Sequence, residues 1–392
     1  MKKIVFMSLV ASSIMMANGY KIPETSTNAV ALGAANIAHN QNSADAAYYN
    51  PAKMVFMSDE NHIEADVTYI GLDKITYKPV GGNEIKSKYE NFYVPTLHYV
   101  SGALGANGVR VGLSITSPGG LSKKWNDAPG STSAKEFTLK TVEVNPTVAF
   151  KINNTLSVAA GFRALYSDGI VTNAYYDMTG TGLDFGYNLA LEYKPMEALE
   201  IGVTYRSKIN MNVDGTTSRV VAGANGDVSV SLPLPAALNL AFAYTFPTKT
   251  TLEAVYERTY WSAYSNLDFN FANATSEFVL GNPKPKNWKD TNTFRFGLTQ
   301  ELNTMTLMAG LVIDESPVPE KTLGFELPGT DTVAVSLGSR YKINDKLDLG
   351  LSALYSIHKS RTVSSSVNDN AINGEFTGGD VLIISAGLGY KF

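Results

Sequence analysis

The sequence contains no cysteine and only four histidines among its 392 residues. The absence of cysteine excludes disulfides, thiolate catalysis and metal sites built on cysteine. His39, His62, His98 and His358 stand singly, and they lack the spacing of a catalytic triad or of a metal-ligand cluster. We therefore expect no enzyme, no metal site and no cofactor.

Charge and long apolar runs are also scarce. Charged residues make up 17% of the chain, and a formal net charge of −4 gives no basic footprint for nucleic acid. The apolar run at 4–16 follows Met1-Lys2-Lys3 and is shorter than the roughly 20 residues that a spanning helix needs. With small residues at 17–19, this pattern predicts a signal peptide over 1–19, cleaved after Gly19 or Ala17.

Aromatic residues and glycine are abundant, with 21 Tyr, 17 Phe and 33 Gly, which favours β structure with many turns. In 183–194, LDFGYNLALEYK, every second residue is apolar or aromatic, and the same alternation recurs in 238–246 and 347–358. A period of two indicates strands with one face in lipid or core and the other in water.

Fourteen segments carry this strand pattern, and an even number is what bacterial single-chain barrels have. They are 62–78, 88–102, 107–117, 138–152, 154–178, 182–194, 198–212, 228–246, 249–271, 289–302, 305–315, 330–343, 346–364 and 379–392.

The connections between these segments alternate between short turns and mostly longer loops, with 179–181 between strands five and six as an exception. A soluble sandwich has no reason to sort its loops in this way, whereas an outer-membrane barrel does. The last segment, VLIISAGLGYKF, ends in Phe392 and is similar to the signal read by the barrel assembly machinery. We predict an all-β fold, a 14-stranded antiparallel transmembrane β-barrel over 60–392, in the outer membrane of a Gram-negative bacterium.

Residues 20–59 show no sustained alternation and are rich in small residues, as in NSADAAYYNPA at 42–52. A barrel of this size has a lumen too wide for its own side chains to fill. We therefore predict that 20–59 forms a hatch inside the lumen, with a short helix over 28–38.

Several motifs, in their order and separation, resemble the FadL/TodX family of outer-membrane transporters for long-chain fatty acids and aromatic hydrocarbons. They are Asn50-Pro51-Ala52 after the small-residue segment, VPTLHYV at 94–100, TYRS at 204–207, WKD at 288–290, DESPVP at 314–319 and the aromatic C-terminus.

The resemblance implies passive uptake of hydrophobic molecules through a hatch-closed barrel, with release sideways into the membrane where the third strand kinks. In this sequence the third strand runs into Ser117, Pro118, Gly119 and Gly120, where proline removes a ladder donor and glycine packs nothing. These four residues either form the lateral gate or begin an outer loop. The resemblance also places Asn50, Pro51 and Ala52 beside this kink.

Strand parity points the basic residues Arg163, Arg206, Lys208, Lys289 and Arg295 into the lumen, because charge facing lipid is costly. Such residues either contact the ligand or pair with lumenal acids, for which Glu143, Asp184, Glu192, Glu253 and Glu257 are available.

We assign Lys289, Arg163, Arg206 and Asn173 to the ligand site. Lys289 matches a basic residue of the family motif, and Asn173 stands where the family has an arginine. That replacement keeps neutral hydrocarbons open as cargo beside carboxylates. The short connection between strands five and six is a second departure from fatty acid transporters of the family.

The favoured function is therefore uptake of long-chain fatty acids, with monoaromatic or other neutral hydrocarbons as the alternative. A general diffusion porin or an outer-membrane enzyme is the alternative from another class. The expected partners are the hydrophobic cargo, outer-membrane lipid and lipopolysaccharide, and the assembly machinery. We expect a monomer.

Overall fold

The computed structural model describes residues 19–392 except 41, 106–107 and 219–224. The predicted signal peptide, apart from Gly19, lies outside the described residues. Within the described ranges, no helix is both long and apolar enough to cross a membrane.

The chain forms a closed antiparallel barrel of fourteen strands, as predicted. Closure comes from β1 (His62–Leu72), which pairs with the last strand, β24 (Val381–Lys391), from His62↔Lys391 to Leu72↔Val381. The sheet has eighteen segments because four of the fourteen strands are each broken in two, namely β5/β6, β10/β11, β12/β13 and β14/β16. Closure pairs the first and last strands, so that neither of them leaves a free edge.

The remaining barrel segments agree closely with the predicted ranges. They are β4 (Glu90–Val100), β5 (Arg110–Thr116), β6 (Gly120–Lys123), β7 (Glu136–Lys151), β8 (Leu156–Thr172), β9 (Asp177–Met196), β10 (Leu199–Arg206), β11 (Ile209–Ser218), β12 (Gly226–Leu234), β13 (Ala237–Thr245), β14 (Thr250–Thr259), β16 (Phe269–Phe271), β18 (Thr291–Glu301), β19 (Met305–Asp314), β20 (Thr332–Lys342) and β21 (Leu347–His358).

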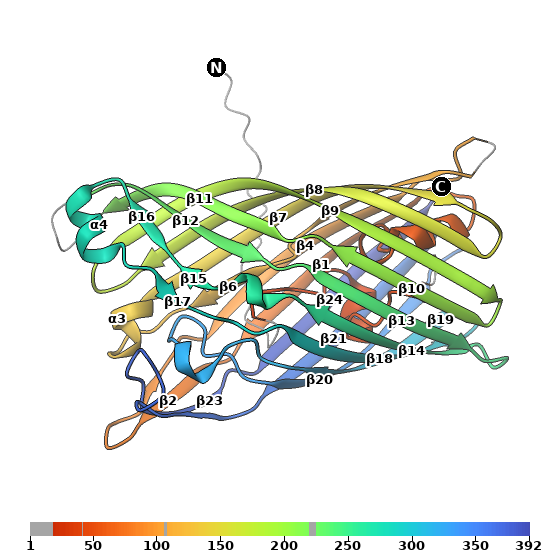
Figure 1. Cartoon of the computed structure of the whole chain (residues 1–392). Coiled ribbons are helices and arrows are strands. Elements are labelled where there is room, and N and C mark those ends of the chain that lie inside the picture. The colour runs from red at the N-terminus through yellow and green to blue at the C-terminus, as the bar shows by residue number, and fades with distance from the viewer. Residues whose placement is uncertain (1–18, 41, 106–107, 219–224) are drawn as a thin grey trace.

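Smaller elements gather at one end of the barrel, with the C-terminus at the other end (Figure 1). One small sheet pairs β2 (Ile75–Pro79), β3 (Ile85–Lys86), β22 (Arg361–Val363) and β23 (Gly374–Gly378), and another pairs β15 (Asn266–Leu267) and β17 (Lys284–Pro285). The helices at this end are α3 (Gly130–Ala134) and α4 (Ala274–Leu280), with the short 3-10 turn η3 (Glu320–Thr322), whereas the 3-10 turn η2 (Trp261–Ala263) follows β14 in the middle part of the barrel (Figure 1).

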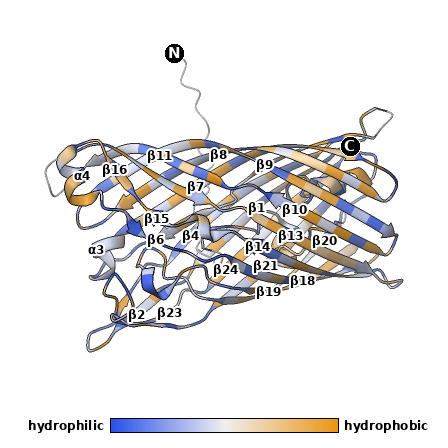
Figure 2. Ribbon diagram, viewed as in Figure 1, coloured by the Kyte–Doolittle hydropathy of each residue, from blue (hydrophilic) through white to orange (hydrophobic). Residues whose placement is uncertain are grey.

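Hydrophobic and hydrophilic residues alternate along the strands of the wall (Figure 2), and burial shows that its two faces differ. Along β9 the outward side chains Phe185, Tyr187 and Leu189 are exposed, whereas the inward residues Asn188 and Ala190 are buried. On β24, Ile384, Leu388 and the terminal Phe392 likewise face outward. An apolar outer face is what a barrel wall in hydrocarbon requires.

The turn between strands five and six lies at 173–176, not at the predicted 179–181. β8 and β9 stay paired from Leu156↔Tyr193 to Thr172↔Asp177. The side-chain oxygen of Asn173 then accepts the backbone N–H groups of Tyr175 and Tyr176 at 2.8 and 3.0 Å. An Asx turn of this kind closes a connection without a glycine, which is why the sequence pattern did not reveal it.

The hatch fills the lumen (Figure 1) with α1 (Thr27–Leu32), α2 (Ala46–Tyr49) and the 3-10 helix η1 (Pro51–Phe56). Helix α1 ends well before the predicted position 38 because Gly33 and Ala34 take left-handed backbone angles, with φ of 57° and 60°. Ser26 caps its start by accepting the N–H of Ala29.

Glycines on the inner wall let the hatch approach the strands closely. A Cβ on Gly338 would lie 2.6 Å from the Cβ of Ala31, and one on Gly297 would lie 2.9 Å from the carbonyl oxygen of Ala35. A Cβ on Gly310 would overlap the carbonyl group of Leu32. The hatch therefore packs backbone against backbone, and small residues on both sides are a steric requirement.

We predict that Gly310→Ala loosens the hatch without preventing barrel formation. Its new methyl group overlaps Leu32, and overpacking of this kind costs about 1–3 kcal/mol. Limited proteolysis of the hatch and ion current across planar bilayers should both increase. The control is Gly169→Ala on β8, where the nearest atom to a new Cβ lies at 3.4 Å. Equal current through the two variants would contradict this account.

Candidate ligand pocket and lateral opening

The third strand is broken by one extra residue. β5 pairs with β7 up to Thr116↔Glu143, and β6 resumes at Gly120↔Lys140. Three residues, Ser117 to Gly119, thus face two on β7, which is a bulge that bends the strand. The predicted failure of regular pairing at this position is confirmed.

The break leaves a stretch of wall without its ladder. β4 pairs with β5 from Val100↔Gly112 to Leu97↔Ile115, and backbone contact resumes only with the hydrogen bond from Lys88 N–H to Lys124 O at 2.8 Å and the isolated bridge Ser87↔Trp125. Among the described residues, no backbone pairing joins 116–123 to 89–96, although the Ser122 hydroxyl donates to Glu90 across this interval at 2.6 Å. We call this interval, 89–96 opposite 116–123, the lateral opening.

The backbone of the third strand turns instead to the hatch. The N–H of Ile22 donates to Pro118 O at 2.9 Å, and the N–H of Gly120 donates to Tyr20 O at 2.7 Å. These hatch residues stand in for the missing strand, so that the bent backbone remains hydrogen-bonded.

Asn50 and Ala52, which the resemblance places beside the kink, make their side-chain and backbone hydrogen bonds within the hatch and to β8 and β9. The Asn50 amide donates to Ile37 O at 3.0 Å and to Glu192 Oε2 at 2.9 Å, and its oxygen caps η1 through the N–H of Ala52. Ala52 O accepts the Ser157 hydroxyl at 2.7 Å. The tripeptide therefore anchors the hatch to β8 and β9. Pro51 begins η1, because a residue without an N–H fits the first position of a helix.

Asp45 is the internal tie of the hatch. Its side chain is fully buried and accepts hydrogen bonds from four surrounding side chains. The donors are Ser26 Oγ at 2.7 Å, Asn28 Nδ2 at 3.4 Å, Asn36 Nδ2 at 3.2 Å and Asn40 Nδ2 at 2.9 Å. One carboxylate thus joins segments on both sides of α1.

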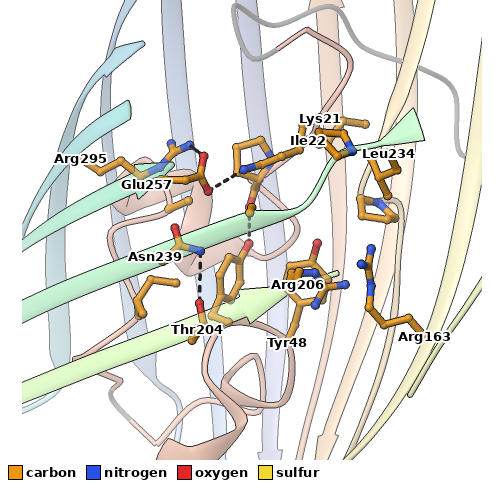
Figure 3. Close-up of a pocket in the computed structure, with 17 residues that line it drawn as sticks. Lys21, Ile22, Tyr48, Arg163, Thr204, Arg206, Leu234, Asn239, Glu257 and Arg295 are labelled. Atoms are coloured by element: carbon orange, nitrogen blue, oxygen red, sulfur yellow. Dashed lines mark hydrogen bonds and ion pairs between the residues drawn. The ribbon is translucent and has the colours of Figure 1, made fainter. Parts of the chain in front are cut away.

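A cavity of about 60 Å³ lies between the hatch and the wall (Figure 3). Apolar groups from the hatch, the break and the β12/β13 junction form much of its surface. They include Ile22, Pro23, Ala34, Ile37, Pro118, Leu234 and Pro235. We call this cavity the hatch pocket.

Two arginines of the hatch pocket share one carboxylate. Arg163 donates to Glu143 Oε2 through Nε and Nη2, both at 2.8 Å, and Arg206 donates to Glu143 Oε1. Arg163 Nη1 also donates to Ser207 O at 2.6 Å. Two guanidinium groups against one carboxylate leave this side of the pocket with excess positive charge.

The opposite side carries a more balanced group of charges. Glu257 pairs with Lys21 at 2.5 Å and with Arg295 at 3.5 Å, and Arg295 lies 3.8 Å from Glu24. In the hatch, burial lowers the pKa of the Lys21 ammonium, against the effect of Glu257. Burial likewise raises the pKa of the Glu24 carboxyl, against the effect of Arg295.

An aromatic pair connects the arginines to the segment that covers the break. The guanidinium of Arg206 lies 4.2 Å from the ring centroid of Tyr48, which packs edge-on against Tyr49. The Tyr49 hydroxyl donates to Pro23 O at 2.6 Å and accepts the N–H of Thr25 at 2.8 Å. A displacement of Tyr48 would therefore disturb Tyr49 and, through its hydrogen bonds, Pro23 and Thr25, which follow Ile22 in the chain.

The structure separates the four predicted ligand residues. Arg163 and Arg206 line the hatch pocket together. Asn173 instead lines a larger cavity of about 310 Å³ at the end with the long loops. The predicted inward orientation of Lys289 is wrong: it is exposed, and the buried lysine of that segment is Lys286.

Local irregularities explain the two misplaced lysines. Lys289 precedes β18, where Trp288 is buried against Tyr20 and Trp261 and turns the next side chain outward. Lys208 is exposed because the register against β9 shifts by one residue between β10 and β11. A shift of one residue exchanges the two faces of a strand.

Sequence reasoning did not find Lys21 or the stacking role of Tyr48. Both lie in the hatch, where strand parity gives no orientation. The predicted pairing of lumenal charges is confirmed for Glu143 and Glu257. Within the described ranges, no cluster of three His, Asp or Glu side chains could hold a metal ion.

These features define a class of protein, a membrane barrel whose lumen is closed by its own N-terminal segment. A profile of the family described as Outer membrane protein transport protein (OMPP1/FadL/TodX) matches residues 8–392. The chain belongs to this family and is an outer-membrane protein.

The individual relatives have low sequence identity to this chain, but the similarity extends over most of both sequences. Outer membrane protein P1 of Haemophilus influenzae is 22% identical and covers 89% of each chain. The long-chain fatty acid transport protein of Escherichia coli is 25% identical over 78% of this chain and 80% of its own.

Two solved structures show the same fold. A FadL homologue of Pseudomonas aeruginosa has a TM-score of 0.83 at 19% identity, covering 95% of this chain and 100% of its own. The toluene transporter TodX of P. putida has a TM-score of 0.74 at 16% identity, covering 94% and 98%.

We predict that Asp45→Ala separates the hatch segments that this carboxylate holds together. The change leaves buried Ser26 and three asparagine amides without their acceptor, and each unpaired buried donor costs about 1–3 kcal/mol. The barrel should still show the gel shift on heating that is typical of folded barrels, while ion current through single channels rises. Asp59→Ala, at a 75% exposed side chain, is the control. A current equal to that of the control would show that the tie does not hold the hatch.

Proposed function

We propose that the protein is a passive outer-membrane transporter for hydrophobic compounds and that long-chain fatty acids are its cargo. The cargo passes the hatch pocket and leaves sideways into the membrane through the lateral opening. The observation that carries the proposal is the position of the hatch pocket, which combines an apolar surface and two arginines with Pro118 of the broken strand.

The shared carboxylate favours an anionic headgroup. Arg163 and Arg206 have one acid, Glu143, between them, and Arg206 faces the ring of Tyr48 on its hatch side. A fatty acid carboxylate would neutralise the remaining positive charge and accept charge-assisted hydrogen bonds. Burial of its chain would contribute about 0.8 kcal/mol per methylene.

The hatch has to move for a whole fatty acid to pass. A cavity of about 60 Å³ is well below the roughly 300–1,000 Å³ of typical small-molecule sites. Displacement of Tyr48 by the headgroup would disturb Tyr49 and, through Pro23, the residues that pair with Pro118. Cargo binding would in this way be coupled to the lateral opening.

The larger cavity at the long-loop end is suited to first capture. Its surface includes Phe137, Tyr175, Tyr176 and Phe269, with Lys286 at its margin. It would replace the outer groove that the short turn at 173–176 cannot build. Asn173 would act here, at the entrance, and not at the hatch pocket.

Neutral aromatic hydrocarbons are the second cargo that the structure supports. Much of the hatch pocket is apolar, and each of its cations already contacts Glu143 or Glu257. A small ring would need less displacement of the hatch than an acyl chain does.

The same proposal covers the assembly of the barrel. The outward apolar face of β24, ending in Phe392, would be read by the barrel assembly machinery, after a signal peptide over 1–19 has directed export. The folded barrel would act as a monomer, surrounded by outer-membrane lipid and lipopolysaccharide.

We predict that Arg206→Met weakens binding of oleate by roughly 10- to 100-fold, because it removes a charge-assisted hydrogen bond worth about 1.5–3 kcal/mol. Isothermal titration of the purified barrel and growth of a complemented deletion strain on oleate would measure this. Arg258→Met, at a half-buried arginine paired with Asp290, is the control. Unchanged oleate binding in Arg206→Met would remove the carboxylate site, and loss of toluene uptake in the same variant would point to a neutral cargo.

A reversible block tests lateral release. Thr96 and Thr116 are the next register-matched positions after Leu97↔Ile115, at the edge of the lateral opening. In Thr96→Cys/Thr116→Cys, a disulfide should stop uptake, and a reductant should restore it in the same cells. The control pair is Thr251→Cys/Thr299→Cys, at positions already paired in the wall. Full uptake by the oxidised first pair would rule out release through this opening.

A further inference from the structure

A third, smaller cavity lies beyond the break, at the end of the barrel that carries the long loops. It has a volume of about 20 Å³ and shares no residue with the hatch pocket. Apolar side chains on its surface include Leu72, Ile75 and Phe376, and its polar side chains include Lys123, Thr330 and His358.

These three polar groups come from separate parts of the chain. Lys123 is the last residue of β6 in the broken third strand, Thr330 belongs to the loop before β20, and His358 ends β21. The cavity therefore lies where the outer half of the third strand meets elements from the C-terminal part of the barrel.

The Lys123 ammonium, Thr330 Oγ1 and His358 Nδ1 have no hydrogen-bond partner in the part of the chain that the structure describes. Lys123 is 2% exposed and Thr330 is 7% exposed. Across the described part of the chain, Thr330 Oγ1 and His358 Nδ1 are buried without a hydrogen bond, and no ion pair or hydrogen bond involves the Lys123 ammonium. A charge and two polar atoms that are buried without hydrogen bonds destabilise the fold, unless a bound ligand supplies those hydrogen bonds.

The surrounding acids are already engaged by other groups. Glu90 accepts the Ser122 hydroxyl at 2.6 Å through Oε2, while its Oε1 is buried without a hydrogen bond in the described part of the chain. Asp380 accepts the backbone N–H of His358 at 2.9 Å, and Asp331 lies 3.5 Å from Lys359. Asp73, the other acid near Lys123, accepts the N–H of Lys74 at 2.7 Å. Each of the three cavity groups can donate a hydrogen bond, the imidazole in its Nδ1–H tautomer. Glu90 and Asp73 lie outside the cavity lining, which contains Lys123 and Lys359 but no acidic residue, so the cavity repels a cation and calls for an acceptor with negative charge.

We propose that this cavity binds a monovalent anion the size of a halide or a carboxylate group, held by Lys123, Thr330 and His358. A cavity of this volume accepts about one atom-sized ligand and no chain. The bound anion ties the outer half of the third strand to β21 and to the loop before β20, so it stabilises the strand next to the lateral opening. The proposal does not depend on the cargo or on the transport route.

Bromide is the probe. Crystals of the full-length protein grown in sodium bromide should show an anomalous scattering peak beside the Lys123 ammonium. The peak should vanish in Lys123→Met and weaken in Thr330→Val, which keeps the charge. It should persist in Lys124→Met, because Lys124 pairs with Glu136 at 3.0 Å outside this cavity. The gel shift on heating confirms that each variant is folded.

Competition identifies the source of the anion. Displacement of bromide by acetate would assign the site to small carboxylates, and displacement by chloride alone would assign it to inorganic anions. No peak in the wild-type protein, or an equal peak in Lys123→Met, would overturn the proposal. Either result would leave the uptake experiments on Arg206 unaffected.

Discussion

The structure depends on one constraint, that backbone hydrogen-bonding groups at the depth of the membrane must find partners inside the protein. Twelve strands of the barrel obey it by pairing with both neighbours along most of their length, whereas β4 and the third strand part at Leu97↔Ile115. The bent backbone of the third strand is satisfied by Tyr20 and Ile22 of the hatch. The hatch is therefore part of the wall as well as the filling of the lumen.

This arrangement joins the cavity to the opening. Tyr20, Lys21 and Ile22 border the break on one side, and Lys21 and Ile22 line the hatch pocket on the other. Any ligand that displaces this segment also removes the substitute pairing at Pro118. Inner-wall glycines such as Gly310 and Gly338 bring the rest of the hatch so close to the strands that it cannot shift without losing its packing.

Charge in the lumen is arranged to hold the hatch more than to leave free binding groups. Glu253 accepts the backbone N–H groups of Ile37, Ala38 and His39, and Lys53 is paired with Glu192 and Glu200. Against this background the pair Arg163 and Arg206, with Glu143 as their common acid, is distinctive. Strand parity alone also predicts that these two arginines face the lumen.

The sequence by itself determined the barrel, its strand ranges and its inward and outward faces, because a period of two is a local property of a strand in lipid. It also located the break, since Pro118, Gly119 and Gly120 cannot sustain a ladder. Tertiary structure decided what the hatch touches: Asn50 anchors it to β9, and Lys21 reaches Glu257. It also decided the side of Lys208 and Lys289, because bulges and buried aromatic residues reset parity within a single residue, and these depend on contacts between segments far apart in the chain.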